Sequence, residues 1–195
     1  MNILIYTITR NDAHKLDRYY SQVSLLPGIF KEHNFYLSIY ENDSTDNTIE
    51  KLNEYDFSMF TDYKITSEKL NVPFFESVDS KDRIQILSSA RNNAILKSDF
   101  LQKVDYVMMI ESDIVYQPRA VRKLLNFNKT YNLDADIVSS VMFWSELNLQ
   151  HYDNYGTRIS ENDRRSSIKD DWKTKEYDEY WATCNGIALF KAEPF

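Results

Sequence analysis

The chain has 195 residues and a formal net charge of −7. This length favours one domain over residues 1–195. The negative charge disfavours binding to nucleic acid or to an anionic membrane, because both need a dense basic surface. Binding of a nucleoside diphosphate is compatible with the negative net charge, because a divalent cation can supply the positive charge. The single cysteine, Cys184, excludes an intramolecular disulfide and a thiolate metal cluster.

The sequence shows no targeting pattern. Its N-terminal apolar run is short and lacks the basic start and the cleavage site of a signal peptide. No stretch approaches the roughly 20 apolar residues of a membrane span. Together with the lone cysteine, these features predict a cytoplasmic protein without a membrane span. The sequence stops soon after a predicted strand, so a domain shortened at its C-terminus is expected.

Strands and helices alternate along the predicted fold. Apolar and β-branched runs predict strands at residues 2–8, 35–40, 57–65, 104–110, 136–143 and 186–190, of which 57–65 is the weakest. Helical spacing predicts helices at residues 13–26, 46–54, 80–102 and 118–131. The fold class is therefore predicted to be α/β, with a mostly parallel central sheet and helices on both sides. Residues 66–79 are expected to form a loop, and residues 144–180 a long functional loop region.

Individual residues set the predicted helix boundaries. Pro27-Gly28 should end the first helix, Ser44 should cap the second, and Pro118 should begin the fourth. The third helix carries apolar residues at helical spacing, which predicts one buried face. The residues of that predicted face are Ile84, Leu87, Ala94 and Ile95.

Three polar clusters follow predicted strands at their carboxyl ends. They are Thr9-Arg10-Asn11, the loop from Glu41 to Asp46, and Glu111-Ser112-Asp113. In open α/β sheets, ligands bind beyond the carboxyl ends of the strands. Each cluster alone is ordinary, but three at successive strand ends should share one crevice.

Glu111-Ser112-Asp113 places two carboxylates two residues apart, just after a buried strand. Mg²⁺ and Mn²⁺ prefer oxygen ligands, and one or two carboxylates with diphosphate oxygens make a sufficient site. The sequence therefore predicts that Glu111 and Asp113 bind a metal ion, which neutralises charge on a departing diphosphate. His151 is a further candidate metal ligand. The alternative is a solvated loop in which the acids merely end the strand.

Two further positions are candidate donor contacts. Asp43 or Glu41 is predicted to accept hydrogen bonds from a nucleobase or ribose, although an Asx-turn with a helix cap also explains part of this loop. Arg91 projects near the apolar face of its helix and needs a partner there, because an unpaired buried charge is costly. The expected partner is Asp43, Asp113 or a donor phosphate. A structural buried ion pair is the equally weighted alternative.

Several segments of the sequence resemble a known enzyme class. YENDSTDNT (40–48), SSARNNAI (88–95) and DYVMMIESDIVY (105–116) resemble the conserved segments of GT-A glycosyltransferases. Three more segments resemble the cryptococcal-type capsule mannosyltransferase family. These are KDRIQILSSARN (81–92), HYDNYGTR (151–158) and WATCNGIALFKAEPF (181–195). The resemblance spans most of the chain in the right order.

The resemblance implies a metal-dependent glycosyltransferase. Its donor would be a nucleoside-diphosphate sugar, GDP- or UDP-linked, with mannose as the implied sugar, and its acceptor a glycan or glycoprotein. It implies donor binding near Asp43 and Asp46, metal binding at Asp113, and helix contacts from Arg91. Thr9, Arg10, Glu41 and Ser112 complete the expected donor site.

Asp153 and Arg158 match the family's Tyr-Asp…Arg motif and are the predicted catalytic residues. If the reaction inverts the sugar's configuration, Asp153 is the candidate general base. Two other functions stay open from the sequence. A sugar nucleotidyltransferase shares the fold and the metal, but usually needs a glycine-rich loop that this chain lacks. A non-catalytic carbohydrate-binding module would need neither nucleotide nor metal.

Overall fold

The computed structural model describes residues 1–75, 81–140, 157–158, 182–183 and 186–193. The chain divides into two compact units. The first comprises Met1–Pro118 and Phe190–Phe195, and the second comprises Arg119–Leu189. The single domain expected over residues 1–195 stays a prediction.

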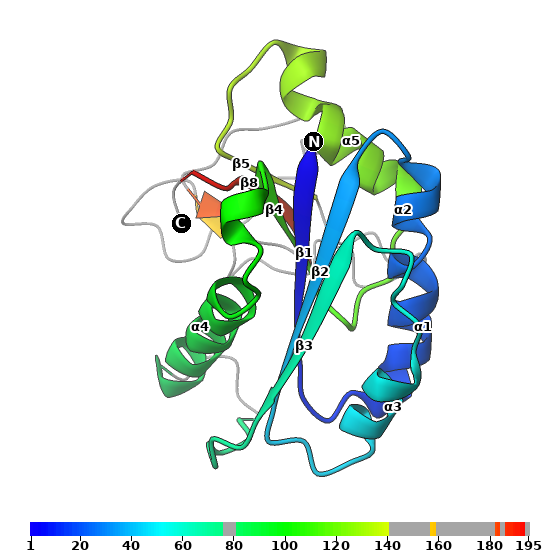
Figure 1. Ribbon diagram of the computed structural model, residues 1–195. Helices are drawn as coiled ribbons and strands as arrows, with labels where there is room; N and C mark the ends of the chain where they lie inside the picture. Colours follow the sequence, from blue (N-terminus) through cyan, green and yellow to red (C-terminus); the bar gives the residue numbers. More distant parts are fainter. Residues whose placement is uncertain (76–80, 141–156, 159–181, 184–185, 194–195) are drawn as a thin grey trace, which may run out of the picture. The chain divides into compact units, whose positions relative to one another are not determined.

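The first unit alternates strands and helices, as the sequence predicted (Figure 1). Its strands are β1 (Asn2–Thr9), β2 (Asn34–Asn42), β3 (Asp62–Glu68) and β4 (Tyr106–Ile110). Its helices are α1 (Ala13–Val23), α2 (Leu26–Ile29), α3 (Thr48–Glu54) and α4 (Lys81–Leu96), followed by the 3₁₀ turn η1 (Leu101–Lys103). Among the described residues, no helix combines the length and apolar character that crossing a membrane requires.

The strands of the first unit are parallel. β1 pairs with β2 on one side and with β4 on the other, and β2 pairs with β3. Within the first unit the hydrogen-bonded order of these strands is β3-β2-β1-β4. The chain therefore builds outward from β1 through β2 to β3, then returns to add β4 beside β1. Open α/β sheets bind ligands beyond the carboxyl ends of the strands at such a reversal.

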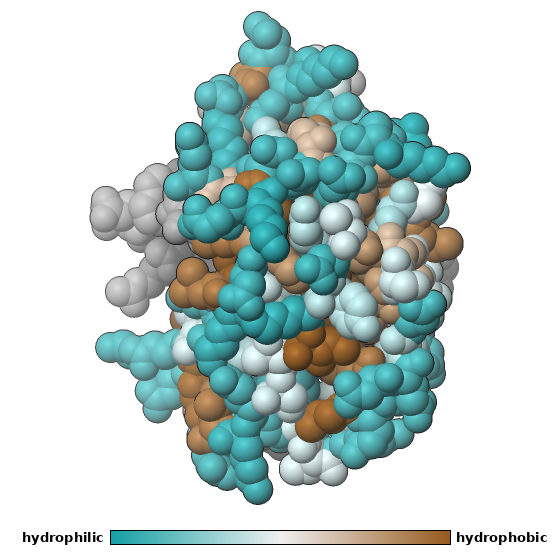
Figure 2. Space-filling model, viewed as in Figure 1, coloured by the Kyte–Doolittle hydropathy of each residue, from teal (hydrophilic) through white to brown (hydrophobic). Residues whose placement is uncertain are grey.

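The sheet of the first unit is covered on both faces. Figure 1 shows α4 on one face and α1 with α3 on the other, so the predicted α/β class with helices on both sides is confirmed. Ile3, Leu4 and Ile5 of β1 are fully buried. Burying one such side chain stabilises the fold by about 1.5–3 kcal/mol. On the face seen in Figure 2, hydrophilic side chains predominate and hydrophobic ones lie in separate areas.

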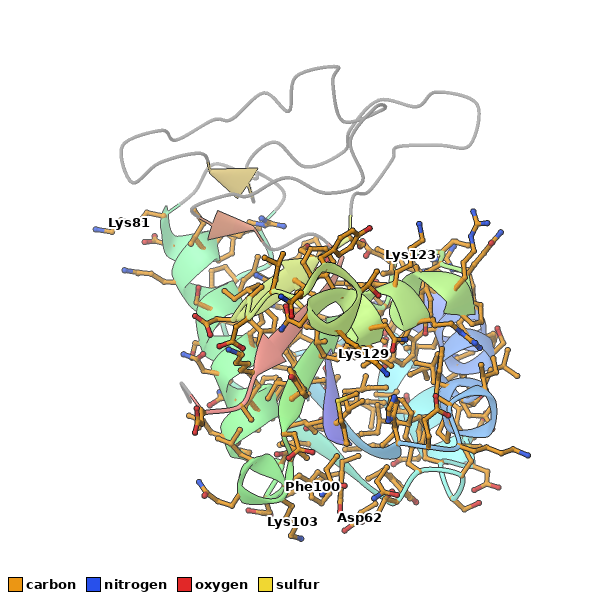
Figure 3. All side chains as sticks on the ribbon, turned by 90° about the horizontal axis from the view of Figure 1, so that it is seen from above. Asp62, Lys81, Phe100, Lys103, Lys123 and Lys129 are labelled. Carbon is orange, nitrogen blue, oxygen red and sulfur yellow. The ribbon has the colours of Figure 1, made fainter. Side chains whose placement is uncertain are left out.

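Helix α4 carries the chain from the carboxyl ends of the strands back to their amino ends. Lys81 begins the helix, and the ring of Phe100, which follows it, lies 5.3 Å from that of Tyr36. Tyr36 is the register partner of Asp62, the first residue of β3. In Figure 3, Phe100 and Lys103 accordingly lie near Asp62, far from Lys81. This direction brings the first half of α4 to the ligand-binding edge of the sheet.

The second unit contains α5 (Pro118–Tyr131), β5 (Ile137–Ser139), β6 (Thr157–Arg158) and β7 (Ala182–Thr183). The helix predicted over residues 118–131 is confirmed, with Val121 and Leu124 buried. β6 and β7 pair as antiparallel strands. β8 (Ile187–Lys191) spans the boundary between the units, and Ser140, next to β5, donates its backbone N–H to the Ile187 carbonyl at 3.0 Å.

Two predicted helix boundaries were wrong. Helix α1 ends at Val23, and Pro27 with Gly28 lies inside the short helix α2, because proline is tolerated in a first helical turn. Ser44 does not cap α3, whose N-cap is Asn47. Asp46 instead accepts the backbone N–H of Thr48 at 3.0 Å, while the Ser44 hydroxyl accepts a hydrogen bond from the loop after β1.

The predicted buried face of α4 was also partly wrong. Ile84 is 55% exposed, whereas Ala90, Ala94 and Ile95 are buried. Small alanines let the helix lie close to β2, where the Ser38 hydroxyl donates to the Ala94 carbonyl at 2.6 Å. The helix ends at Leu96 rather than at residue 102, and Asp99 has a positive φ of 66°, which a continuing helix does not allow. Strand β3 begins and ends later than the predicted 57–65.

Candidate functional site

The loops after β1 and β2 are joined directly by hydrogen bonds. The backbone N–H of Asn11 donates to the Ser44 hydroxyl at 2.9 Å. The side-chain oxygen of Asn11 accepts the backbone N–H of Thr45 at 2.7 Å. Asn11 has a positive φ of 54°, a backbone conformation that asparagine tolerates better than most residues. The first two polar clusters therefore form one surface.

Asp12 joins the third cluster to the other two. Its Oδ2 accepts hydrogen bonds from the hydroxyls of Thr9 at 3.2 Å and Ser112 at 2.9 Å. Its backbone N–H donates to the Thr48 hydroxyl at 3.0 Å, and Lys15 neutralises its Oδ1 at 2.8 Å. The three strand-end clusters meet, as predicted. The sequence reasoning missed Asp12, although an acid between a strand-end cluster and a helix was a usable signal.

Glu41 is fully buried, and its carboxylate is used inside the protein. One oxygen accepts the backbone N–H of Ser44 at 2.7 Å, and the other accepts the Ser67 hydroxyl at 2.6 Å. These bonds tie the loop after β2 to the end of β3. A contact from Glu41 to a nucleobase or ribose stays a prediction, and the geometry favours a role in shaping the loop.

Asp46 holds two helix N-termini together. Its Oδ2 accepts the backbone N–H of Ala13 at 3.2 Å, and its Oδ1 accepts that of Thr48 at 3.0 Å. Burial acts to raise the pKa of Asp46, but the hydrogen bonds from Thr48 and Ala13 outweigh it and lower the pKa. The negative charge is therefore favoured where α1 and α3 begin, as the helix dipole also prefers.

Asp43 binds the segment that follows β3, residues 69–75, which we call the strap. Its two oxygens accept the backbone N–H groups of Asn71 at 2.8 Å and Val72 at 3.1 Å. Burial acts to raise the pKa of Asp43, yet the hydrogen bonds from Asn71, Asn42 and Val72 outweigh it and lower the pKa. Asp43 itself has a positive φ of 57°, so the backbone turns there to aim the carboxylate at the strap.

Arg10 binds the same strap from the end of β1. Its guanidinium donates to the carbonyls of Val72 at 2.9 Å and Pro73 at 3.2 Å. The guanidinium carbon also lies 5.5 Å from the centre of the Phe74 ring, a cation–π contact. Arg10 and Asp43, both predicted to contact the donor, thus contact one short stretch of the chain.

Arg91 pairs with Glu111, a partner that the sequence reasoning did not name. The guanidinium lies 2.6 Å from Glu111 Oε1, and the two side chains are 30% and 29% exposed. The expectation of Asp43 or Asp113 as the protein partner was wrong. Arg91 lies beside Glu111, the first residue after β4, and therefore pairs with the acid closest to the strand end.

The three residues after β4 face three different surroundings. Glu111 pairs with α4, and Ser112 is buried and bound to Asp12. Asp113 is exposed, and its backbone carbonyl accepts Arg18 Nη2 at 3.0 Å. The described structure records no protein hydrogen bond or ion pair for its carboxylate. The backbone at Asp113 is therefore held while its side chain stays available.

A divalent cation fits this arrangement only with ligand help. In the part of the chain that the structure describes, no three His, Cys, Asp or Glu side chains group closely enough to hold a metal. Mg²⁺ or Mn²⁺ needs only one or two carboxylates when phosphate oxygens and water complete its ligands. Asp113 meets that need, with Glu111 as the adjacent acid.

The remaining predicted residues lie outside the described side chains. His151 and Asp153 fall in residues 141–156, and only the backbone of Arg158 is described, in β6. Their predicted roles as metal ligand and catalytic residues stay predictions.

Comparison with solved structures finds loose likenesses. Staphylococcus aureus TarS 1–349 in complex with UDP-GlcNAc is 13% identical at a TM-score of 0.46, over 74% of this chain and 39% of TarS. The mannosyltransferase PcManGT from Pyrobaculum calidifontis, in complex with GDP-Man and Mn²⁺, is 14% identical at a TM-score of 0.45. The match covers 71% of this chain and 35% of PcManGT. Core-mannan synthase A from Aspergillus fumigatus, in its Mn/GDP form, is 12% identical at a TM-score of 0.39. The match covers 99% of this chain and 60% of the synthase. The chain thus spans less than two thirds of each of these proteins.

Comparison by sequence is decisive for the family. No curated protein matches the chain individually. The model of the family described as Cryptococcal mannosyltransferase 1 matches residues 2–195, nearly the whole chain. This match confirms the resemblance found in the sequence motifs. The chain belongs to the cryptococcal mannosyltransferase 1 family.

Proposed function

We propose that this chain is the catalytic domain of a metal-dependent glycosyltransferase. It would move a sugar, with mannose as the sugar that the family implies, from a GDP- or UDP-linked donor to a glycan or glycoprotein. The observation that carries the proposal is the meeting of three strand-end loops around Asp12, with the carboxylate of Asp113 exposed beside them. Family membership supports the same reaction class.

Asp113 is the residue proposed to hold the cation. A bound Mg²⁺ or Mn²⁺ would supply positive charge to the departing diphosphate. The protein's own contribution is to fix the position of Asp113. Arg18 binds its backbone carbonyl at 3.0 Å, and Ser112 anchors the preceding residue to Asp12 at 2.9 Å. Because its backbone is held this way, Asp113 would lose little conformational freedom when its carboxylate binds the cation, which favours affinity.

Arg91 and Glu111 are proposed to line the same site from its α4 side. About a third of each side chain is exposed, so both can reach solvent or a ligand while they stay paired. The pair keeps a guanidinium close to the place where donor phosphates would lie, and phosphates are the anions that guanidinium groups bind best. Glu111 would bind the metal directly or through water.

Thr9, Glu41, Asp46 and Ser112 are proposed to shape the site rather than to contact the donor. Thr9, Glu41 and Ser112 are buried, and all four donate or accept hydrogen bonds within the joined loops. Preorganised loops of this kind hold ligand-binding groups at fixed positions before the substrate arrives. The roles proposed for Asp153, Arg158 and His151 and the cytoplasmic location remain sequence predictions.

Release of nucleoside diphosphate from GDP-mannose and from UDP-sugars tests the proposal. We expect release that needs Mn²⁺ or Mg²⁺, stops with a chelator, and falls strongly in Asp113→Ala. Metal-independent release that survives Asp113→Ala would contradict the metal role. Pyrophosphate release from a nucleoside triphosphate would identify a sugar nucleotidyltransferase instead. Sugar binding without nucleotide or metal would identify a carbohydrate-binding module.

A further inference from the structure

The strap is held from both sides by side chains of the neighbouring loops. Asp43 accepts two of its backbone N–H groups, those of Asn71 and Val72. Arg10 donates to two of its carbonyls, those of Val72 and Pro73. The strap belongs to no helix or strand, so these side-chain bonds satisfy backbone groups that a helix or sheet would otherwise satisfy. Two oppositely charged side chains thereby fix the chain just before Phe74.

Phe74 is exposed although its backbone is fixed. The residue is 62% exposed, so much of its ring can reach solvent or a ligand. The Arg10 guanidinium lies 5.5 Å from the ring centre. This cation–π contact orients the ring, and most of the ring surface stays open to a ligand. The result is a flat aromatic surface held at a defined place.

The strap is bound by residues that follow β1 and β2, whereas the proposed metal residue follows β4. Asp43 follows β2 and the strap follows β3, whereas Asp113 follows β4. The order β3-β2-β1-β4 places β2 and β4 one strand to either side of β1, so their ends are about 10 Å apart at a strand spacing of about 4.8 Å. A nucleoside diphosphate needs a comparable separation between its base and its distal phosphate.

We propose that Phe74 is the surface on which the nucleobase of the donor stacks. Asp43 and Arg10 are positioning residues, which act through the strap that carries Phe74. This inference rests on the proposed function, because it assumes a nucleotide donor. Stacking needs only the flat face of a base, so Phe74 supplies affinity for a nucleotide rather than a choice among bases.

Nucleotide binding by Phe74 variants tests the stacking. The dissociation constants of GDP and of UDP are measured by calorimetry with Mn²⁺ present. We expect Phe74→Ala and Phe74→Leu to weaken the tighter nucleotide by roughly 5-fold to 100-fold, the range that stacking of one base spans. Phe74→Tyr should keep wild-type affinity. Leu70→Ala is the matched control, because Leu70 is also exposed on the strap, at 45%.

Binding of pyrophosphate measures the contribution of the phosphates without that of the base. Pyrophosphate carries the diphosphate without a base, so Phe74→Ala should bind it with Mn²⁺ as tightly as the wild type does. If wild-type protein binds GDP or UDP and Phe74→Ala binds them equally well, the stacking inference is overturned while the proposed function stands. Weaker use of an acceptor sugar with unchanged nucleotide binding would also overturn it. If wild-type protein binds neither nucleotide, the proposed function fails with it.

A double-mutant cycle tests the positioning role of Asp43. Asp43→Asn removes a carboxylate acceptor, so alone it should weaken nucleotide binding and raise the KM for the donor more than it lowers kcat. In the Phe74→Ala background the same change should have little further effect, since residues that act through one contact are not additive. Full additivity would show that Asp43 acts independently of Phe74, and would refute its positioning role.

Discussion

Two acidic loops at the same edge of the sheet use their carboxylates in opposite ways. At the end of β2 and in the loop that follows, Glu41, Asp43 and Asp46 each accept hydrogen bonds from the protein itself. After β4, Glu111 pairs with Arg91, and Asp113 is exposed with only its backbone carbonyl bound, to Arg18. The segment with more acids therefore uses them for hydrogen bonds within the protein, and the segment with fewer leaves one carboxylate exposed.

The difference shows that acidic residues at strand ends do not by themselves mark ligand contacts. Loops without regular structure leave backbone N–H groups without partners, and carboxylates are strong acceptors for them. Asp and Glu are thus selected for loop architecture as readily as for chemistry. What distinguishes Asp113 is that the described structure uses its backbone and leaves its side chain exposed.

Removing the carboxylate of Asp113 should give the largest effect. Asp113→Ala should lower metal-dependent kcat/KM on the order of 10²-fold to 10⁴-fold, because the cation loses its protein ligand. The thermal midpoint should change little, since the side chain is exposed. Nucleoside diphosphate release and a thermal melt measure the two quantities. Asp62→Asn, at the amino end of β3, is the control and should keep wild-type activity. Equal activity of both variants would show that the exposed carboxylate of Asp113 is not needed for the reaction.

Removing Glu41 should give the largest loss of stability. Glu41→Ala leaves the Ser44 N–H and the Ser67 hydroxyl without their acceptors in a fully buried site. We expect a loss of about 3 kcal/mol in the free energy of unfolding, measured with urea. Glu54→Ala, exposed at the end of α3, should change it by less than about 0.5 kcal/mol. If Glu41→Ala is as stable as this control, the proposed architectural role is wrong.

The Arg91–Glu111 pair should contribute a smaller coupling. Both side chains are about 30% exposed, so solvent screens the pair. A cycle of Arg91→Met, Glu111→Gln and the double variant should give a coupling of about 0.5–1 kcal/mol in the free energy of unfolding. A coupling near zero, with activity abolished in Glu111→Gln, would show that Glu111 serves the proposed metal site and that its pairing with Arg91 does not stabilise the fold.

The dependence of stability on pH should show the smallest effect. The folded pKa of Asp46 lies below the ordinary value of 3.8, so its ionised form stabilises the fold above that pH. This contribution is lost as the pH falls through the folded pKa. Asp46→Asn should therefore lose less stability than the wild type between pH 7 and pH 3, measured by urea midpoints. Asn47→Ser, a neighbour that does not titrate, should follow the wild-type profile. An unchanged profile in Asp46→Asn would count against the bonds to Ala13 and Thr48.

Much of the fold was predictable from the sequence. The apolar runs at residues 2–8 and 104–110 and the helical spacing at 118–131 identified β1, β4 and α5. The alternation of elements gave the α/β class and placed three polar clusters at one edge. Boundaries were less predictable. Pro27 was expected to end a helix, but it lies in the first turn of α2. Ile84 was expected on the buried face of α4, but it is exposed because alanines of that helix make the closer contact.

The sequence by itself determined the family, the class of fold and the presence of three polar clusters at strand ends. These follow from local periodicity and from motifs, which the chain carries in order. Only the tertiary structure decided which acid serves which partner. Hydrogen bonds such as those from the strap to Asp43 and from Arg91 to Glu111 join residues 20 or more positions apart. Their pairing depends on strand order and helix direction, which no local pattern specifies.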